Sequence, residues 1–286
     1  DKFCKFCVVP YTRGAEFSRS MNELIKEIEI LVSNGAKEIT LLGQNVNAYN
    51  YEGKKLSDLI YEISKISDLK RIRYTTSHPV DFSEDLINAH KHFKKLMPLV
   101  HLPVQSGSNE ILKKMNRKHT VEEYLEIINS LKKSNHLINF SSDFIIGYPG
   151  ETEKDFEATI KLIEEVKFIN SYSFIYSARP GTPAAKLEKV KDNVSKKRLI
   201  IFQKKAEEIK MEYRKTLFNK TVFVLFENKM KLKDAYFGRD EHANSVIVRS
   251  TEDINGKVKK VNIIGGNQNS LFGEICPEKK KENFAA

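Results

Sequence analysis

The sequence predicts an α/β fold built on a parallel sheet, followed by a small all-β barrel. Strand and helix signals alternate over residues 20–182, and the strands are almost continuously apolar, which is typical of a parallel sheet covered by helices. After Thr221, short strand signals follow one another without long helices, which is typical of a small barrel. We therefore predict one domain at residues 1–215, a second at 216–278 and a disordered tail at 279–286.

The first helix is predicted by its ends as well as by its apolar stripe. Ser20 stands three residues before Glu23, as in a capping box, and Gly35 is placed to terminate the helix. The next elements follow from hydrophobic periodicity. We expect strands at 38–42, 71–76, 99–104, 139–146 and 172–176, and helices at 57–66, 83–93, 108–116 and 121–134.

Two further helices complete the first domain. Thr152 and Asp155 form a second capping pair, and Phe156, Ile160 and Ile163 are expected on the inner face of the helix that they open. A long basic helix is expected at 195–216. The strands of the second domain are expected at 222–226, 245–248, 257–264 and 271–275.

The composition indicates a cytoplasmic protein without a membrane segment. Hydrophobic residues make up 40% of the chain and charged residues 30%, as in a globular protein. No apolar run approaches the roughly 20 residues that cross a bilayer, and the N-terminus has no signal-peptide pattern. Three cysteines without obvious disulfide partners fit a reducing compartment.

The net charge of +10 is concentrated in one connecting segment and in the tail. Residues 1–182 carry 25 basic and 24 acidic side chains, whereas residues 183–215 carry 11 and 5. Residues 216–278 carry 9 and 8, and residues 279–286 add three lysines against one glutamate. A basic patch attracts polyanions such as nucleic acid, and a solvated helix face is the alternative.

Polar and small residues gather just after the predicted strands. In parallel α/β folds, ligands bind at the carboxyl ends of the strands, so we expect an active-site rim here. Turn chemistry alone explains the glycines and prolines, but it explains Gln105, Asn45 and Arg179 less readily. The groups concerned are Gly43-Gln44-Asn45, Thr76-Ser77-His78, Gln105-Ser106, Gly147 and Arg179.

Two thiols, Cys4 and Cys7, lie three residues apart near the N-terminus. This spacing lets both thiolates reach one soft metal centre, either iron–sulfur or zinc, and a redox dithiol is the third possibility. The remaining cysteine, Cys276, lies far away in sequence and is most simply an inert barrel residue. A closed zinc site therefore lacks nearby cysteine partners.

The residues around the two thiols resemble a known cofactor-binding loop. The run Phe3-Cys4-Lys5-Phe6-Cys7-Val8-Val9-Pro10-Tyr11-Thr12-Arg13-Gly14 resembles the loop C-x-x-x-C-x-aromatic-C of radical S-adenosylmethionine (SAM) enzymes. It is most similar to that of the MiaB-type methylthiotransferases, which modify tRNA. Four further segments, at 41–49, 74–79, 101–108 and 143–152, resemble the same family in the same order, so the likeness covers nearly the whole chain.

The resemblance implies a partial (β/α) radical SAM barrel followed by an OB-like, RNA-binding TRAM barrel. It implies a four-iron, four-sulfur cluster and SAM, which generate a radical that takes hydrogen from an adenine carbon. An N-terminal domain with a second such cluster would supply sulfur, and a second SAM the methyl group. The family substrate is isopentenyladenosine beside the tRNA anticodon, and the electron donor is a protein such as a flavodoxin.

The resemblance also assigns roles to individual residues. Cys4 and Cys7 match the second and third cluster cysteines. The first would stand immediately before Asp1, so we expect this chain to be inactive alone and to bind a cluster poorly. The alternative role of Gln105 and Ser106 is to form hydrogen bonds that stabilise their turn, and Arg179 could instead contact an RNA phosphate or form a structural ion pair. The candidate SAM contacts are Phe6, Gly43, Gln44, Gln105, Ser106, Ile146, Gly147 and Arg179.

The remaining candidate residues are two histidines of the first domain and three residues of the barrel. His78 and His101 are taken as structural histidines, and Phe237, Arg239 and Lys229 are eligible RNA contacts in the barrel. The alternatives for function are a sister methylthiotransferase acting on threonylcarbamoyl-adenosine in tRNA or on a ribosomal-protein aspartate, and a non-catalytic RNA-binding protein. A zinc-stabilised protein is a third possibility.

Overall fold

The computed structural model describes residues 2–232 and 234–277, and these form two compact units. The first unit is Asp1–Lys210 and the second is Met211–Ala286, so the division falls inside the long helix α8, Asp192–Lys215. The predicted boundary lay five residues later, after residue 215. No helix in the described part of the chain is long and apolar enough to span a bilayer. The predicted tail, 279–286, lies outside the described residues.

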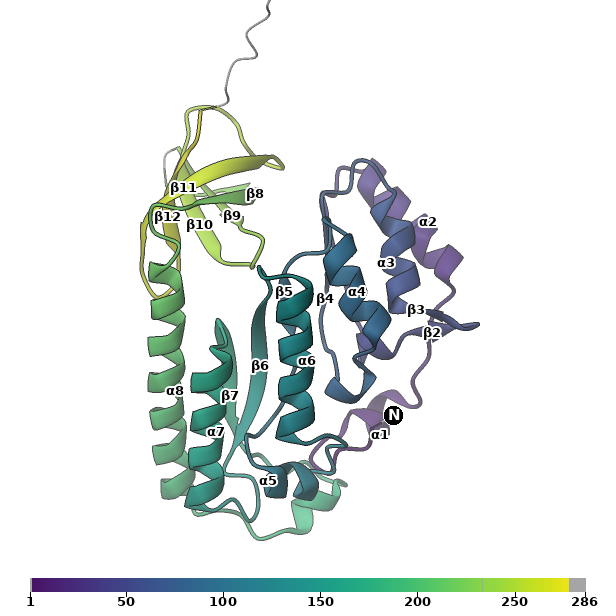
Figure 1. Ribbon diagram of the computed structural model, residues 1–286, viewed down its shortest axis with the longest axis vertical. Helices are drawn as coiled ribbons and strands as arrows, with labels where there is room; N and C mark the ends of the chain where they lie inside the picture. The colour runs from purple at the N-terminus through teal and green to yellow at the C-terminus, as the bar shows by residue number, and fades with distance from the viewer. Residues whose placement is uncertain (1, 233, 278–286) are drawn as a thin grey trace, which may run out of the picture. The chain divides into compact units, whose positions relative to one another are not determined.

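The first unit is built on an open parallel sheet (Figure 1). β1 pairs with β4, and β5, β6 and β7 pair in that order. Between the two sets, the Ile72 amide donates to the Lys95 carbonyl at 2.7 Å, and the Met97 amide donates to the Ile72 carbonyl at 2.9 Å. The strands are β1 Glu38–Leu41, β4 Arg71–Tyr74, β5 Leu99–His101, β6 Asn139–Ile146 and β7 Asn170–Ile175.

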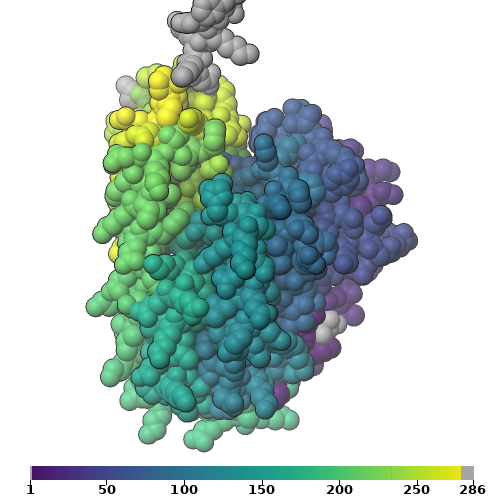
Figure 2. Space-filling view, viewed as in Figure 1, coloured from purple at the N-terminus to yellow at the C-terminus, as the bar shows by residue number. Residues whose placement is uncertain are grey.

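Helices connect these strands and cover one face of the sheet; Figure 2 shows the molecule from that helical side. The main ones are α2 Met21–Ser33, α3 Leu56–Ser64, α4 Glu84–His92, α6 Val121–Ser134, α7 Glu153–Val166 and α8. Short elements lie in the loops: α1 Val9–Arg13, α5 Asn109–Lys114, the 3-10 turns η1 Val46–Ala48, η2 Pro79–Asp81 and η3 Pro183–Lys186, and the hairpin of β2 Asn50–Tyr51 and β3 Lys54–Lys55.

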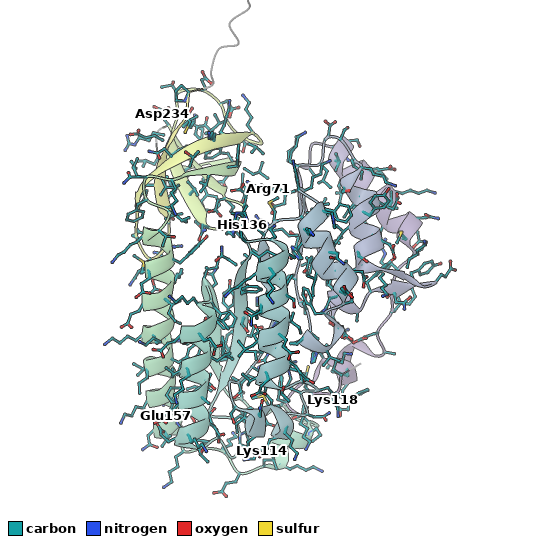
Figure 3. The ribbon with its side chains drawn as sticks, viewed as in Figure 1. Arg71, Lys114, Lys118, His136, Glu157 and Asp234 are labelled. Atoms are coloured by element: carbon teal, nitrogen blue, oxygen red, sulfur yellow. The ribbon has the colours of Figure 1, made fainter. Side chains whose placement is uncertain are left out.

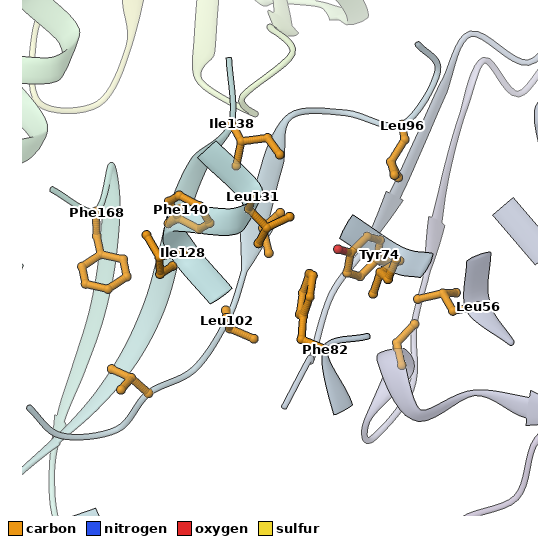
Figure 4. Packing of buried hydrophobic residues seen from close by; sticks show 14 of the residues in the cluster. Leu56, Tyr74, Phe82, Leu96, Leu102, Ile128, Leu131, Ile138, Phe140 and Phe168 are labelled. Atoms are coloured by element: carbon orange, nitrogen blue, oxygen red, sulfur yellow. The ribbon is translucent and has the colours of Figure 1, made fainter. Parts of the chain in front are cut away.

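The core lies between the sheet and the helices, as Figure 4 shows for residues such as Leu131 and Phe140. Alternate residues of β6 point into it, and the ring of Phe144 lies 5.5 Å from that of Phe168 and 4.8 Å from that of Phe202 on α8. Each fully buried ring contributes about 1.5–3 kcal/mol to folding. This packing fixes α8 against the sheet.

The predicted caps were right in one case and wrong in another. Thr152 and Asp155 form the expected capping box at the start of α7. At α2, the Ser20 side chain makes no capping hydrogen bond, so the predicted box with Glu23 is wrong, although the helix begins where expected. Gly35 ends α2 with φ +103°, a conformation that favours glycine. Ile160, expected on the inner face of α7, is only partly buried.

The second unit is a closed barrel with the strand order β10-β12-β11-β8-β9. Its core is formed by residues such as Val224, Phe226 and Val261. β9 was not predicted, because Gly238 interrupts its apolar pattern. That glycine is required: a Cβ there would collide with the carbonyl oxygen of Leu225 on β8. The strands are β8 Thr221–Lys229, β9 Ala235–Arg239, β10 Ser245–Arg249, β11 Val258–Gly266 and β12 Leu271–Ile275.

The basic segment between the units is partly neutralised. Arg198 of α8 forms ion pairs with Glu151 and Glu153, both at 2.9 Å, and Lys205 pairs with Glu164 at 3.0 Å. These acidic partners come from α7 and the loop before it. Part of the excess charge at 183–215 therefore stabilises the first unit.

Candidate active site

The cysteine loop lies at the end of the first unit that also holds α1 and α5 (Figure 1). Within the loop, the Cys7 amide donates to the Cys4 carbonyl at 3.0 Å, which forms a tight turn between the two cysteines. The backbone of Lys5 anchors the loop through two hydrogen bonds. The Lys5 amide donates to the Met115 carbonyl at the end of α5, and the Lys5 carbonyl accepts from the Ala184 amide of η3. Two neighbouring segments therefore hold the thiols in place.

A buried guanidinium lies against the first thiol. Arg117 is 9% exposed, and its Nη1 lies 3.7 Å from the Sγ of Cys4. Its Nη2 donates to the Pro103 carbonyl in the loop after β5, while its Nε has no partner within the described residues. Burial raises the pKa of the Cys7 thiol, whereas the positive charge of Arg117 lowers it.

Phe6 packs among aromatic and apolar side chains of the neighbouring loops. It contacts the cluster that contains Tyr148 and Tyr176, whose rings lie 5.2 Å apart. Ile145, next to the predicted site residue Ile146, packs against the same cluster. The structure thus brings the cysteine loop close to the end of β6, as the sequence predicted. Ile146 itself is 1% exposed and its carbonyl accepts from the Tyr176 amide at 2.8 Å, so the residue belongs to the core.

Three successive strand ends have left-handed backbone. Thr76 follows β4 with φ +64°, Gln105 follows β5 with φ +77°, and Gly147 follows β6 with φ +70°. Non-glycine residues rarely adopt this conformation, and they concentrate at functional sites when they do. At Gln105 the strain is held by two hydrogen bonds to β6, with the Asp143 carbonyl and the Ile145 amide, both at 3.0 Å. The predicted rim is therefore a set of tightly constrained turns.

Ser106 belongs to the structure of its turn. It is 1% exposed, and its hydroxyl accepts from the Ser108 amide at 3.2 Å and lies 3.4 Å from the Thr159 hydroxyl of α7. This arrangement favours the turn-stabilising alternative over a SAM contact. Arg179, by contrast, is exposed, and its carbonyl accepts from the Thr182 amide and hydroxyl.

The Gln105–Ser106 turn also depends on the glycine that follows it. A Cβ at Gly107 would lie 2.5 Å from the Ala158 carbonyl oxygen and 2.6 Å from the Thr159 Cα, and both belong to the backbone of α7. We expect Gly107→Ala to lower the free energy of unfolding by about 1–3 kcal/mol. Chemical denaturation measures the loss, with Gly265→Ala, which meets nothing within 4 Å, as the control. Equal losses in both variants would contradict this packing.

Gly43 and Gln44 lie elsewhere. They are exposed and line a cavity of about 570 Å³ along β1 and α2, together with residues such as Phe17 and Leu24. No residue of the cysteine loop lines this cavity. One polar chain connects their loop to the N-terminus: the amide group of Asn45 donates to Asp81 at 2.6 Å, and Asp81 pairs with Lys2 at 2.6 Å.

The two histidines have different environments. His78 accepts from the Val80 amide through Nδ1 and caps η2, which agrees with the structural role assigned to it. His101 lines a second cavity, on the sheet face opposite the core, together with Asp143 and Tyr172. Sequence reasoning missed this group, and it missed Arg117. The available signal was the polar residues at alternate positions, Ser141 and Asp143, in a strand whose opposite face carries Phe140 and Phe144.

The thiol pair is short of a complete metal site by itself. Among the described residues, no three His, Cys, Asp or Glu side chains converge as metal ligands. The donors nevertheless suit an iron–sulfur cluster: two thiols held in one loop, beside a buried cation that stabilises negative charge. Lys114, labelled in Figure 3 at this end of the unit, braces the neighbouring β6–α7 loop by donating to the Gly150 carbonyl at 2.9 Å.

Comparisons with known proteins support this assignment. A tRNA-2-methylthio-N(6)-dimethylallyladenosine synthase from Pelagibacter ubique (strain HTCC1062) is 58% identical over 286 residues, which covers 99% of this chain and 64% of that protein. The corresponding synthase of Wolbachia sp. subsp. Brugia malayi (strain TRS) is 54% identical, with 97% and 64% covered. The chain thus spans slightly less than two thirds of the length of these curated relatives.

Solved structures show the same fold at low sequence identity. The coproporphyrinogen III oxidase HemN from Escherichia coli, a radical SAM enzyme, superposes with a TM-score of 0.53 at 14% identity, covering 84% of this chain and 64% of that one. The methyltransferase TsrM from Kitasatospora setae gives 0.53 at 18% identity, covering 64% and 36%. The predicted fold class, a partial barrel followed by a small all-β barrel, is therefore confirmed. The family model of the radical SAM superfamily matches residues 1–163, and the chain belongs to that superfamily.

Proposed function

We propose that this chain is the radical SAM and RNA-binding part of a tRNA methylthiotransferase. The reaction adds a methylthio group to carbon 2 of the adenine in isopentenyladenosine next to the anticodon. The observation that carries the proposal is the Cys4–Cys7 loop, fixed at the carboxyl ends of parallel strands against a buried cation. The names and the identity of the curated relatives support the substrate.

Each part of the site has a proposed task. Cys4 and Cys7 ligate the cluster, which together with SAM supplies the radical chemistry. Phe6 lies beside the adenine of SAM, because it packs with Ile145 at the end of β6, and Ile146 and Gly147 stay proposed contacts at the same strand end. The remaining predicted contacts stay proposals: Gln105 and Arg179 at neighbouring strand ends, and Gly43 and Gln44 at the end of β1.

The second unit is proposed to bind the tRNA. Its β8 and β9 place aromatic and basic side chains side by side: the Arg239 guanidinium lies 5.3 Å from the centre of the Phe237 ring, and the Lys229 ammonium lies 5.6 Å from that of Tyr236. The Arg239–Phe237 pair suits an unstacked base and a phosphate, whereas Tyr236 is 2% exposed and belongs to the barrel core. Phe237, Arg239 and Lys229 are the residues that the sequence marked as eligible, and they stay proposed RNA contacts.

Three further components belong to the proposal. The part of the relatives beyond this chain is proposed to include an N-terminal domain with a second four-iron, four-sulfur cluster as the sulfur source. The reaction needs an electron donor, for which a flavodoxin is the proposed class. A tRNA substrate and the reduced thiols imply a cytoplasmic location.

Anaerobic reconstitution with iron and sulfide tests the proposal. The chain is compared with a version that carries one additional cysteine before Asp1, by iron and sulfide content, visible absorbance and SAM cleavage under reduction. We expect the added thiol to give a four-iron cluster that cleaves SAM, because three thiolates complete the protein ligands and two do not. Cys276→Ser is the control and leaves the iron content unchanged.

If neither form holds iron, the cluster assignment fails and a non-catalytic RNA-binding protein replaces it. Stoichiometric zinc without colour would instead favour a zinc-stabilised protein. Once SAM cleavage is established, turnover is assayed with the relatives' additional N-terminal sequence joined to this chain. Isopentenyladenosine tRNA, threonylcarbamoyl-adenosine tRNA and the ribosomal protein are the three substrates, and methylthiolation of either of the last two alone would overturn the proposed substrate.

A further inference from the structure

A polar cavity of about 350 Å³ lies on the sheet face that the core does not use. Its size is at the lower end of the range of about 300–1,000 Å³ typical of small-molecule sites. All five strands of the parallel sheet (β1, β4, β5, β6 and β7) contribute residues to its wall. His101 comes from β5, Ser141 and Asp143 from β6, and Tyr172 from β7.

Aromatic side chains stand exposed beside this cavity. Tyr172 is 51% exposed, and Phe174, two residues later on the same strand, is 61% exposed. Residues two apart on a strand point to the same face, so both rings belong to the cavity side of β7. Exposed aromatic rings on a sheet are the platforms on which RNA-binding proteins stack unpaired bases.

A hydrogen-bond donor and an acceptor lie next to these rings. The Nδ1 of His101 lies 2.9 Å from the hydroxyl of Ser141, which is 4% exposed, and its Nε2 lies 3.5 Å from Oδ2 of Asp143. When the Ser141 hydroxyl donates to Nδ1, the proton of the imidazole is on Nε2. The Asp143 carboxylate is 33% exposed to the cavity. The wall therefore presents an N–H group and a carboxylate side by side.

An adenine edge is complementary to this pair. Adenine carries a ring nitrogen that accepts a hydrogen bond directly beside an exocyclic N–H that donates one, and a single substituent on the exocyclic nitrogen leaves one N–H. Guanine presents two acceptors, N7 and O6, on the corresponding major-groove edge, and the second would face the carboxylate. Donor, acceptor and stacking rings thus suit adenine and disfavour guanine.

We propose that His101, Asp143, Tyr172 and Phe174 form a recognition site for an adenine base extruded from RNA. Tyr172 and Phe174 stack on the base, Asp143 accepts from the exocyclic N–H, and His101 donates to the adjacent ring nitrogen. This inference rests on the proposed function for its RNA substrate. It assigns the specificity for the base to side chains that lie apart from the cysteine loop.

Fluorescence anisotropy with three labelled anticodon stem–loop RNAs tests this site in the cluster-free chain. They carry adenine, guanine or no base at the target position. We expect the adenine RNA to bind about tenfold or more tightly than the abasic RNA, because stacking of one base has an effect of this order. Tyr172→Leu is expected to abolish that difference, and Tyr172→Phe to retain it. Asp143→Asn is expected to remove the preference for adenine over guanine.

The outcomes separate this site from the proposed function. The affinity for the abasic RNA reports contacts elsewhere and is expected to stay constant in all three variants. Equal binding of adenine and abasic RNA by the unsubstituted chain overturns the inference, as does a base preference that survives both Tyr172→Leu and Asp143→Asn. Iron content and SAM cleavage are measured separately, without RNA. A chain that neither holds iron nor cleaves SAM rejects the proposed function. A preference for adenine that is preserved in such a chain still supports the site.

Discussion

Replacement of Arg198 by methionine is expected to lower the free energy of unfolding of the first unit by about 3–5 kcal/mol. The side chains of Arg198 and Glu151 are 7% and 2% exposed, and their Nη1 and Oε1 atoms lie 2.9 Å apart. The same guanidinium donates to the Glu151 carbonyl at 3.1 Å and to Glu153 at 2.9 Å. In the variant, the Glu151 carboxylate remains buried and accepts only from the Gly147 amide.

The pH dependence of this loss follows from the carboxylate. Burial raises the pKa of Glu151, and Arg198 opposes that shift. Without Arg198 the pKa rises further in the folded chain, so folding takes up a proton, and stability is gained at low pH and lost as the pH rises through the folded pKa. The deficit of Arg198→Met relative to the parent chain is therefore expected to be larger at pH 8 than at pH 5.

Chemical denaturation at the two pH values measures this effect. Adding Glu151→Gln to Arg198→Met is expected to recover most of the lost stability, because the buried charge is then absent. Lys205→Met removes an exposed ion pair from the same helix and is expected to have a much smaller effect. A pH-independent loss that Glu151→Gln fails to rescue would show that the buried pair is not its cause.

The sequence predicts an element well where the hydrophobic periodicity of the segment agrees with the way that segment packs in the fold. The strand at 139–146 and the helix at 121–134 have the predicted bounds, because each is long, periodic and clearly delimited. β9 was missed because its glycine is selected by the close approach of Leu225, a residue of another strand. The hydrophobic pattern of a segment indicates which of its side chains are buried, but it does not indicate which other strand's backbone packs against that segment.

The same distinction applies to the site. The cysteine loop and the strand-end turns were predicted because their chemistry is contained in consecutive residues. Arg117 was not, because its role depends on the end of α5 placing it beside Cys4, far away in sequence. His101 and Asp143 are likewise separated in the sequence by two helices, α5 and α6, and meet only when β5 pairs with β6. Gly43 and Gln44 lie at the predicted strand end but line another cavity.

Replacement of Arg117 by methionine is expected to make the reduction potential of a cluster on Cys4 and Cys7 more negative by on the order of 100 mV. Reduction adds negative charge, and a guanidinium 3.7 Å from the Cys4 sulfur favours the reduced form. A unit charge several ångströms away at an effective dielectric constant of about 20 contributes roughly 2–3 kcal/mol. For one electron, about 59 mV corresponds to a tenfold change in the equilibrium.

A redox titration followed by electron paramagnetic resonance measures this shift in the reconstituted chain with the additional cysteine. Iron content is expected to be unchanged, because methionine fills a similar volume and both thiol ligands, Cys4 and Cys7, are retained. Lys113→Met removes an exposed cation from the neighbouring helix and is expected to leave the potential where it was. Arg117→Lys keeps the charge without the planar fork that reaches both Cys4 and Pro103, so an intermediate potential is expected. If Arg117→Met and Lys113→Met have the same potential, the buried guanidinium has only a structural role, and the charge that favours reduction must come from elsewhere in the protein.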